Sequence, residues 1–179
     1  MRYLILVFSM FLLNANAVAE LPLDEDEGCH KGQMEQFGQY LGSWKIQDFA
    51  LARDGGGWSE QDGAVWNFVC IGNGVAIQDF WMPNEGGVGT NLRMYNQERD
   101  SWDIAWSSTR TPHMSHIQAT EQESGNILMT YVFPKQMPDR RITFFPAEKN
   151  KWKWRQEIST DGGKTWLEVY RIEAARILP

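Results

Sequence analysis

The sequence predicts an all-β protein, an antiparallel up-and-down β-barrel of about ten strands with a short N-terminal helix. Short apolar segments that alternate with period two follow one another from residue 43 onward, and turn residues separate them. Between these segments, no stretch has the period of a long helix. Gly42-Ser43-Trp44 opens the first segment and Arg171 lies in the last. Because a barrel closes when its first and last strands pair, we expect Arg171 to cover Trp44 at one end.

The expected strands are bounded by glycine- and asparagine-rich turns such as Gly72-Asn73-Gly74 and Asn84-Glu85-Gly86-Gly87. We expect strands near residues 43–51, 60–71, 75–83, 88–96, 101–108, 114–121, 126–134, 139–146, 151–159 and 165–175. Their short sequential connections favour a meander over a Greek key. Residues 33–41 are expected to form the short helix, which Gly42 ends.

The N-terminus has the pattern of a secretory signal peptide, expected at residues 1–19. Arg2 supplies the positive charge, residues 4–13 are apolar, and small residues precede cleavage after Ala19, with Ala17 nearly as suitable. The apolar run is shorter than the roughly 20 residues that span a bilayer. We therefore expect an acidic arm at 20–35, a barrel domain at 36–179, and a periplasmic or secreted protein without a membrane span.

The net charge argues against nucleic acid as a partner. The chain carries −6 at pH 7, and removal of residues 1–19, where Arg2 is the single charged residue, gives −7. Binding to nucleic acid depends on neutralising phosphates, and an acidic chain without a basic cluster is poorly suited to that. The sequence carries no signal for a particular oligomeric state.

The two cysteines, Cys29 and Cys70, are expected to form a disulfide, because an exported chain enters an oxidising compartment. The alternative is two buried thiols. A zinc site is not expected, since His30 is the single further soft ligand nearby and structural zinc takes four. The acidic run Asp24-Glu25-Asp26-Glu27 also lacks the spaced ligands of a calcium loop. We expect no metal and no cofactor.

Strand alternation assigns one face of each strand to the interior. On this basis the last strand turns Leu167, Val169 and Arg171 inward, and Phe133 follows Tyr131 inward. The chain has nine tryptophans, which either fill the interior or line a cavity for a planar or long apolar molecule. The expected ligand-binding residues are Trp81, Met94, Trp102, Trp106, Met129, Tyr131, Trp154 and Gln156.

Two residues are weak candidates for catalysis. Asp79 shares a strand face with Ile77 and Trp81, so it either points inward or lies on an outward or edge position. A buried carboxylate needs a partner, for which Arg93 or Arg171 would serve. His116 either lines the interior or is a surface or core histidine. A haem site would call for a histidine near the C-terminus, and none follows His116.

The segment Ser159-Thr160-Asp161-Gly162-Gly163-Lys164-Thr165-Trp166 matches the Asp-box pattern Ser-x-Asp-x-Gly-x-Thr-Trp. Asp boxes recur in sialidases, but one copy in a chain of this length does not make a propeller. Asp161 can accept hydrogen bonds from its own turn, and Trp166 can pack back over the hairpin. We expect a structural hairpin.

Several of these features together resemble the calycin superfamily, which includes lipocalins, fatty-acid-binding proteins and nitrobindin-like barrels. Leu41-Gly42-Ser43-Trp44, Tyr95 with Trp102 and Trp106, and the Asp-box hairpin followed by Arg171 are also similar to a poorly characterised bacterial group of lipocalin-like domains, over residues 36–176. The resemblance implies a cavity for a small hydrophobic or aromatic molecule. An enzyme of hydratase, isomerase or cyclase type, or a packed structural or interaction domain, are the alternatives.

Overall fold

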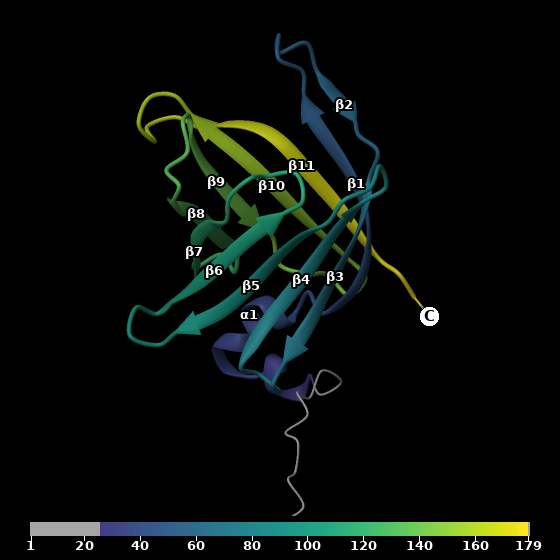
Figure 1. Ribbon diagram of the computed structural model, residues 1–179, viewed down its shortest axis with the longest axis vertical. Helices are drawn as coiled ribbons and strands as arrows, with labels where there is room; N and C mark the ends of the chain where they lie inside the picture. Colours follow the sequence, from purple (N-terminus) through teal and green to yellow (C-terminus); the bar gives the residue numbers. More distant parts are fainter. Residues whose placement is uncertain (1–25, 179) are drawn as a thin grey trace, which may run out of the picture.

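The computed structural model describes residues 26–178, which form a closed antiparallel barrel (Figure 1). Ten strands close the barrel, and β2 (Trp58–Glu60) adds a short hairpin partner to one end of β1. The barrel strands are β1 (Gly42–Leu51), β3 (Ala64–Ile71), β4 (Ala76–Pro83), β5 (Gly89–Asn96), β6 (Ser101–Ser108), β7 (Ser115–Glu121), β8 (Ile127–Phe133), β9 (Asp139–Phe144), β10 (Lys151–Ser159) and β11 (Leu167–Arg176). Apart from β2, each strand pairs with its neighbours in sequence, which confirms the predicted meander.

The first and last strands close the barrel, as the sequence predicts. β1 pairs with β11 in antiparallel register from Trp44 opposite Arg176 to Ala50 opposite Tyr170. Because closure gives the edge of β11 a partner, the barrel has no free edge there. The fold class predicted from the alternation of apolar residues is therefore correct.

The N-terminal segment covers one end of the barrel, here called the closed end; the end that carries β2 is the open end (Figure 1). It consists of two short 3-10 helices, η1 (Glu27–His30) and η2 (Gly32–Met34), followed by α1 (Glu35–Gly38). The α-helix is shorter than the expected 33–41, because its first part winds as η2 and its last residues lead into β1. Among residues 26–178, no helix is long and apolar enough to cross a membrane. The expected signal segment at 1–19 lies outside the described residues.

A disulfide joins this segment to the barrel wall. Cys29 in η1 is bonded to Cys70 in β3, with Cα atoms 6.0 Å apart, so the predicted pairing is confirmed. The Gly28 backbone N–H also donates to Asn73 Oδ1 in the β3–β4 turn, at 2.7 Å. The segment is therefore attached to the barrel both covalently and through the backbone.

The expected strand at residues 60–71 is two strands, β2 and β3. The chain turns at Gly63, whose φ of +75° is left-handed and suits glycine. The buried Asp48 carboxylate accepts a hydrogen bond from the Gly63 N–H at 3.0 Å, and the Asp48 carbonyl accepts one from the Gln61 N–H at 2.9 Å. Asp48 thus stabilises the bend that separates β2 from the barrel.

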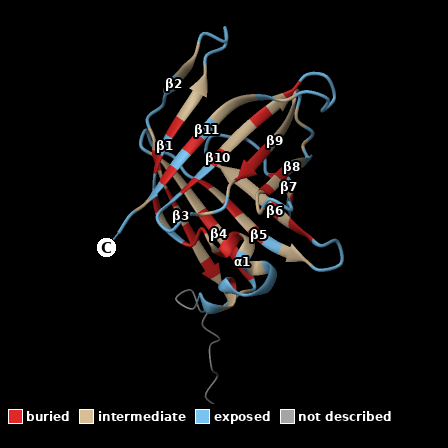
Figure 2. Cartoon of the chain, turned by 180° about the vertical axis from the view of Figure 1, so that it is seen from behind, coloured by how far each residue is buried: buried red, intermediate tan, exposed pale blue. Residues whose placement is uncertain are grey.

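Aromatic side chains fill the closed end. Tyr40 follows α1, and its ring centroid lies 5.0 Å from that of Trp152 and 5.3 Å from that of Phe144. The Tyr40 hydroxyl donates to the Phe145 carbonyl at 2.8 Å, and the Trp102 indole donates to Gln36 Oε1 at 2.8 Å. Figure 2 shows buried segments in red on α1 and on the strands beside it. The interior near α1 is therefore packed solid rather than hollow.

The expected contact between Trp44 and Arg171 is wrong. The guanidinium of Arg176 covers the Trp44 ring, with 4.0 Å between the guanidinium carbon and the ring centroid. Arg171 is exposed, pairs with Phe49 near the open end, and lies over Trp58 at 4.1 Å. Since β11 runs antiparallel to β1, the residue opposite the start of β1 is the last of β11. The arginine that covers Trp44 is therefore Arg176, five residues after Arg171.

Two assignments of strand faces are also wrong. On β11 the inward residues are Tyr170, Ile172 and Ala174, and Leu167 is exposed. Both faces of β11 carry apolar residues, so alternation alone did not decide between them. On β8, Phe133 is exposed because the pairing with β7 shifts register, with Tyr131 opposite Ile117 but Phe133 opposite His116.

Candidate functional site

The open half of the barrel contains a cavity of about 320 Å³ that opens to solvent at one side. Side chains from nine strands form its walls, and apolar and aromatic residues predominate. Its lining comprises Trp66, Trp81, Pro83, Val88, Gly89, Asn91, Arg93, Trp106, Ser108, Arg110, Ile117, Met129, Tyr131, Ile142, Phe144, Trp154, Gln156, Tyr170 and Ile172. The packed aromatics of the closed end, which begin at Trp66 and Phe144, form its floor.

Aromatic rings in edge-to-face contact make up much of the wall. Trp66 and Trp81 lie 5.0 Å apart between ring centroids at 89°, and Trp154 and Tyr170 lie 6.1 Å apart at 89°. Such contacts stabilise the ring orientations beyond area burial alone. Burial raises the pKa of both Tyr131 and Tyr170, so their phenols keep their protons at neutral pH. The walls therefore offer rigid apolar surfaces and the neutral Tyr131 hydroxyl, whereas the Tyr170 hydroxyl donates to the buried Asp48 carboxylate.

Gly89 makes room for one of these rings. A Cβ atom at Gly89 would lie 2.1 Å from Cη2 of Trp106, which is far inside van der Waals contact. Gly89 on β5 is paired directly with Ser108 on β6, so the Trp106 indole extends along the sheet and across the glycine. The absence of a side chain at Gly89 therefore determines where this wall of the cavity lies.

A buried ion pair lies at the inner side of the cavity. Arg93 on β5 and Asp79 on β4 are both fully buried, and Arg93 Nη1 contacts Asp79 Oδ2. Asn91 donates its side-chain amide to both Asp79 oxygens, at 3.1 and 3.0 Å. The Arg93 guanidinium carbon also lies 4.8 Å from the Phe37 ring centroid and 5.3 Å from that of Phe68. The inward reading of Asp79 and its pairing with Arg93 are therefore correct.

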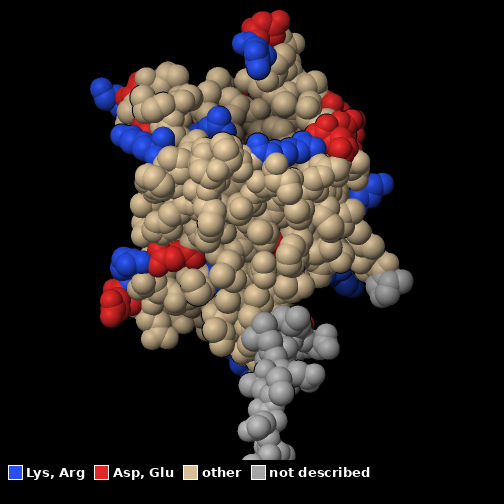
Figure 3. Space-filling view, viewed as in Figure 1, with Lys and Arg blue, Asp and Glu red and all other residues tan. Residues whose placement is uncertain are grey.

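Charged residues flank the opening. Arg110, between β6 and β7, lines the cavity and forms an ion pair with Glu85 in the β4–β5 loop. Its Nη2 also donates to the Gly86 carbonyl at 2.7 Å. In Figure 3, basic and acidic side chains gather along the upper part of the molecule, below the β1–β2 hairpin. The two loops are thus joined across one side of the opening.

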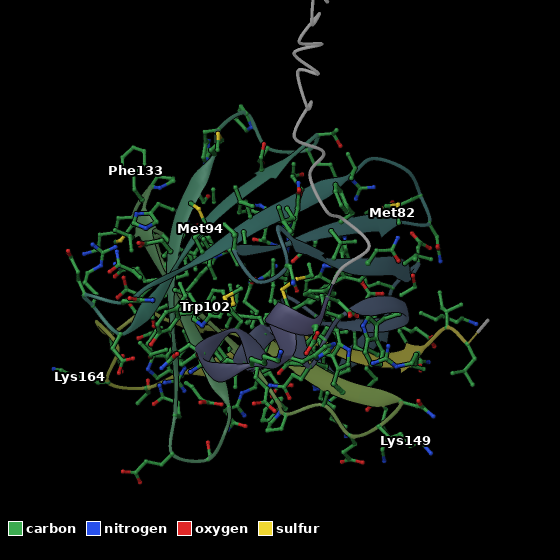
Figure 4. The ribbon with its side chains drawn as sticks, turned by 90° about the horizontal axis from the view of Figure 1, so that it is seen from below. Met82, Met94, Trp102, Phe133, Lys149 and Lys164 are labelled. Atoms are coloured by element: carbon green, nitrogen blue, oxygen red, sulfur yellow. A yellow bond between two sulfur atoms is a disulfide. The ribbon has the colours of Figure 1, made fainter. Side chains whose placement is uncertain are left out.

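Six of the eight expected ligand-binding residues line this cavity: Trp81, Trp106, Met129, Tyr131, Trp154 and Gln156. The expectation that Met94 faces the interior is wrong, because it is 49% exposed on the outer face of β5. Trp102 is buried, but it lies beside α1 at the closed end, outside the cavity lining (Figure 4). Its position near the start of β6 places it at the opposite end of that strand from Trp106.

His116 does not share a site with Asp79. It lies on the outer face of β7, 43% exposed, and its Nε2 is 3.0 Å from Asp103 Oδ1. Although burial raises the pKa of Asp103, hydrogen bonds from His116 and Asn96 outweigh this effect and lower it. Among residues 26–178, no group of three or more His, Cys, Asp and Glu side chains is arranged to hold a metal ion.

Several lining residues escaped the sequence reasoning, notably Trp66, Asn91, Arg93, Arg110 and Tyr170. On β5 the inward face is Gly89, Asn91 and Arg93, whereas the more apolar set with Met94 points outward. The sequence did contain a signal for this inward face of β5: if Asp79 on the neighbouring strand faces inward, its carboxylate needs buried hydrogen-bond donors. Polar residues on an interior strand face are typical of a functional site.

The Asp-box hairpin lies between β10 and β11 and forms the expected structural turn. Asp161 accepts hydrogen bonds from the Lys164 and Thr165 amides at 3.0 and 2.9 Å and from the Thr165 hydroxyl at 2.6 Å. The hydrogen bond from the Thr165 side chain is the largest of the effects that lower the pKa of Asp161 to about 2. The Trp166 indole donates to the Gly163 carbonyl at 3.1 Å, and Arg141 covers its ring at 4.3 Å.

Comparison with solved structures agrees with the barrel fold. The S-type phycobiliprotein lyase CPES from Guillardia theta superimposes with a TM-score of 0.57 at 16% identity, over 86% of this chain and 96% of that chain. Rv2717c from M. tuberculosis superimposes with a TM-score of 0.56 at 9% identity, over 81% of this chain and 97% of that chain. No protein-family model and no curated protein matches the chain. The likeness is one of fold alone.

Proposed function

We propose that this protein binds a small hydrophobic or aromatic molecule inside the open half of its barrel. The observation that carries the proposal is the aromatic-lined cavity of about 320 Å³, which is within the common range for small-molecule sites. Trp81, Trp106 and Trp154 provide flat apolar walls, and Gln156 and Ser108 add polar groups that can orient a bound molecule. Its calycin-type fold supports the same proposal.

The tryptophans lie in two different settings. Trp44 and Trp152 are buried in the packed closed end, where their role is to fill space. Trp81 and Trp106 are only partly buried and border the cavity. A barrel completely filled by its own side chains, which was one alternative from the sequence, therefore describes the closed half and not the open half.

No observation favours the enzyme that the sequence suggested as an alternative. Its two candidate residues lie on opposite faces of the barrel wall, with Asp79 inside and His116 outside. Asp79 also does not line the cavity, and both its oxygens already contact Asn91 and Arg93. An acid or base that acts on a bound molecule must reach it within hydrogen-bond distance.

We also propose that the protein works outside the cytoplasm, as a barrel domain at residues 36–179 preceded by an acidic arm at 20–35. The Cys29–Cys70 disulfide supports this location, because disulfides persist in oxidising compartments. The signal-like pattern at residues 1–19 supports it from the sequence. N-terminal sequencing of protein recovered from the periplasm or medium should begin at Glu20 or Val18. An uncleaved N-terminus on cytoplasmic protein would contradict this location.

Native mass spectrometry of protein purified from its own compartment tests the binding function. We expect a retained small molecule that is released on denaturation. Independently, titration with apolar dyes should give saturable binding and should raise the melting temperature, because a ligand that binds only the folded state stabilises it. If no molecule is retained, and no dye or fatty acid binds or raises the melting temperature, the proposal is wrong.

A further inference from the structure

The buried Arg93 has hydrogen-bond donors that no described side chain or backbone group accepts from. Its Nη1 contacts Asp79, but neither Nε nor Nη2 has a hydrogen-bond partner among the described residues. Arg93 is fully buried and lines the cavity. An unpaired donor that is buried away from water costs free energy, which a bound acceptor would recover.

The two free donors form one edge of the guanidinium. Nε–H and an Nη2–H point in parallel on the same side of the plane, which fits the two oxygens of a carboxylate. This protein contains an example of that geometry, because Arg141 donates through Nε and Nη2 to the two oxygens of Glu157, at 2.8 and 3.0 Å. Among residues 26–178, no carboxylate lies against the corresponding edge of Arg93.

The polar groups of the cavity lining also favour an acceptor. Two arginines, Arg93 and Arg110, line it, each paired with one carboxylate outside the lining, Asp79 and Glu85, and no Asp or Glu occurs among its described lining residues. The buried Trp66 Nε1, which also belongs to the lining, has no partner either. Asp79 keeps both amide contacts from Asn91, so it remains paired when Arg93 shares its charge with a second acceptor.

We propose, building on the binding function above, that the molecule held in the cavity is an apolar or aromatic carboxylate. Its carboxylate binds the Nε–Nη2 edge of Arg93, and its apolar body lies between Trp81, Trp106 and Trp154 toward the opening. Because neighbouring side chains cover both nitrogens, these side chains must shift when the carboxylate binds. A bidentate, charge-assisted pair at a buried arginine is both stronger and more selective than a single neutral hydrogen bond. The site therefore selects an acid over the alcohol of the same skeleton.

Matched pairs of probe molecules test this selectivity by calorimetric titration of the folded, disulfide-bonded protein. Naphthoic acid with naphthalenemethanol samples planar molecules, and dodecanoic acid with dodecanol samples elongated ones. In at least one pair we expect the acid to bind about tenfold to a hundredfold more tightly than the alcohol, as the loss of a charged hydrogen-bonded pair implies. Acid and alcohol that bind equally would leave a binding barrel but overturn the carboxylate proposal. If none of the four probes binds while a retained molecule or an apolar dye does, the carboxylate proposal is overturned and the binding function stands.

A double variant tests the residue assignment. Arg93→Met alone leaves Asp79 buried without its cation and is expected to fold poorly. Arg93→Met combined with Asp79→Asn removes both charges, and the asparagine can still contact Asn91. In the double variant we expect the ratio of acid affinity to alcohol affinity to fall to about one. Arg99→Gln is the control, because Arg99 pairs with Asp103 on the outer face and lies outside the cavity.

A variant of Arg110, the arginine beside the opening, shows which arginine binds the carboxylate. If Arg110→Gln removes the preference for the acid and the double variant retains it, the carboxylate binds at the opening and the assignment to Arg93 is overturned. If the folded double variant, verified by its circular dichroism spectrum and melting transition, retains the preference, Arg93 is also excluded. Loss of the preference in the double variant, with Arg99→Gln unchanged, supports the proposal.

Discussion

The guanidinium of Arg176, the last residue of β11, lies over the indole of Trp44, near the start of β1, with 4.0 Å between the guanidinium carbon and the ring centroid. Its Nη1 also donates to the Leu41 carbonyl at 2.9 Å, just before β1 begins. The Trp44 indole in turn donates to the Tyr40 carbonyl at 2.6 Å. The first strand, the last strand and the covering segment after α1 therefore meet at this one pair.

Truncation at this pair should destabilise the barrel far more than truncation of Arg171. For Trp44→Ala we expect a loss of about 3–5 kcal/mol in unfolding free energy, because a fully buried ring is removed. For Arg176→Ala we expect about 1–3 kcal/mol, from the cation–π contact and the hydrogen bond to Leu41. Arg171→Ala removes an exposed contact with Trp58 and should cost about 0.5–1 kcal/mol. Urea unfolding measures all three, and an Arg171→Ala variant less stable than Arg176→Ala would contradict this reading.

The sequence identified the barrel and its closure but not the arginine that completes it. Gly42-Ser43-Trp44 marks the start of β1 from local residue types, and strand alternation needs no knowledge of partners. Which arginine covers Trp44 depends on the register between β1 and β11, and residues more than 130 apart in the chain determine that register. Both Arg171 and Arg176 lie on β11, but Arg171 pairs with Phe49, five residues after Trp44, so the expected contact would require a register five residues away from the one observed.

The sequence predicted only part of the cavity lining, because contacts between strands also determine which residues face inward. Apolar alternation correctly placed Trp81, Trp106 and Trp154 on its wall. It failed on β5, where Arg93 faces inward and Met94 faces outward, against the usual preference of both residue types. That inversion is stable because Asp79 and Asn91 on the same face supply partners for the buried charge. Contacts between residues on neighbouring strands, such as the Arg93–Asp79 pair, cannot be recognised from the alternation within a single strand.

Removal of the disulfide should weaken the attachment of the N-terminal segment. Cys29 and Cys70 are 41 residues apart, so a chain-entropy model gives a loss of about 4 kcal/mol for Cys29→Ala with Cys70→Ala. Free-thiol titration of the exported, denatured protein should detect no reactive thiol in the unmodified chain. Two reactive thiols there, or an unchanged urea midpoint in the double variant, would contradict the expectation.

The Asp-box turn should make stability depend on pH in the acidic range. Because the pKa of Asp161 is lowered to about 2 when the protein is folded, the unfolded chain takes up its proton first as the pH falls. The stabilisation is therefore complete above the ordinary carboxyl pKa, near 4, and is lost as the pH falls toward 2. Asp161→Asn should lower the melting temperature above pH 5, and this difference from the parent protein should shrink between about pH 4 and pH 2.

A second variant separates the charge of Asp161 from the turn geometry. Thr165→Val removes the hydroxyl that donates to Asp161, which is the largest cause of the lowered pKa. We therefore expect the pKa of Asp161 to rise toward its ordinary value, as measured from the carboxyl carbon shift by NMR. A pKa of Asp161 that stays near 2 in Thr165→Val would assign the effect to the backbone amides instead.

The position of the Trp106 ring should control access to the cavity. Gly89→Ala places a methyl group 2.1 Å from Cη2 of Trp106, so the indole must shift, and we expect a stability loss of about 1–3 kcal/mol from overpacking. The displaced ring reshapes the cavity, so apolar probes should bind at least about tenfold more weakly.

Trp106→Ala should also weaken binding of the apolar probes, because it removes a wall of the cavity. Trp58→Ala should not, since Trp58 packs under Arg171 outside the cavity. Calorimetry is the suitable measurement, because Trp106 itself contributes to the fluorescence. Equal affinity in Trp106→Ala, Gly89→Ala and Trp58→Ala would show that the probes bind elsewhere on the protein.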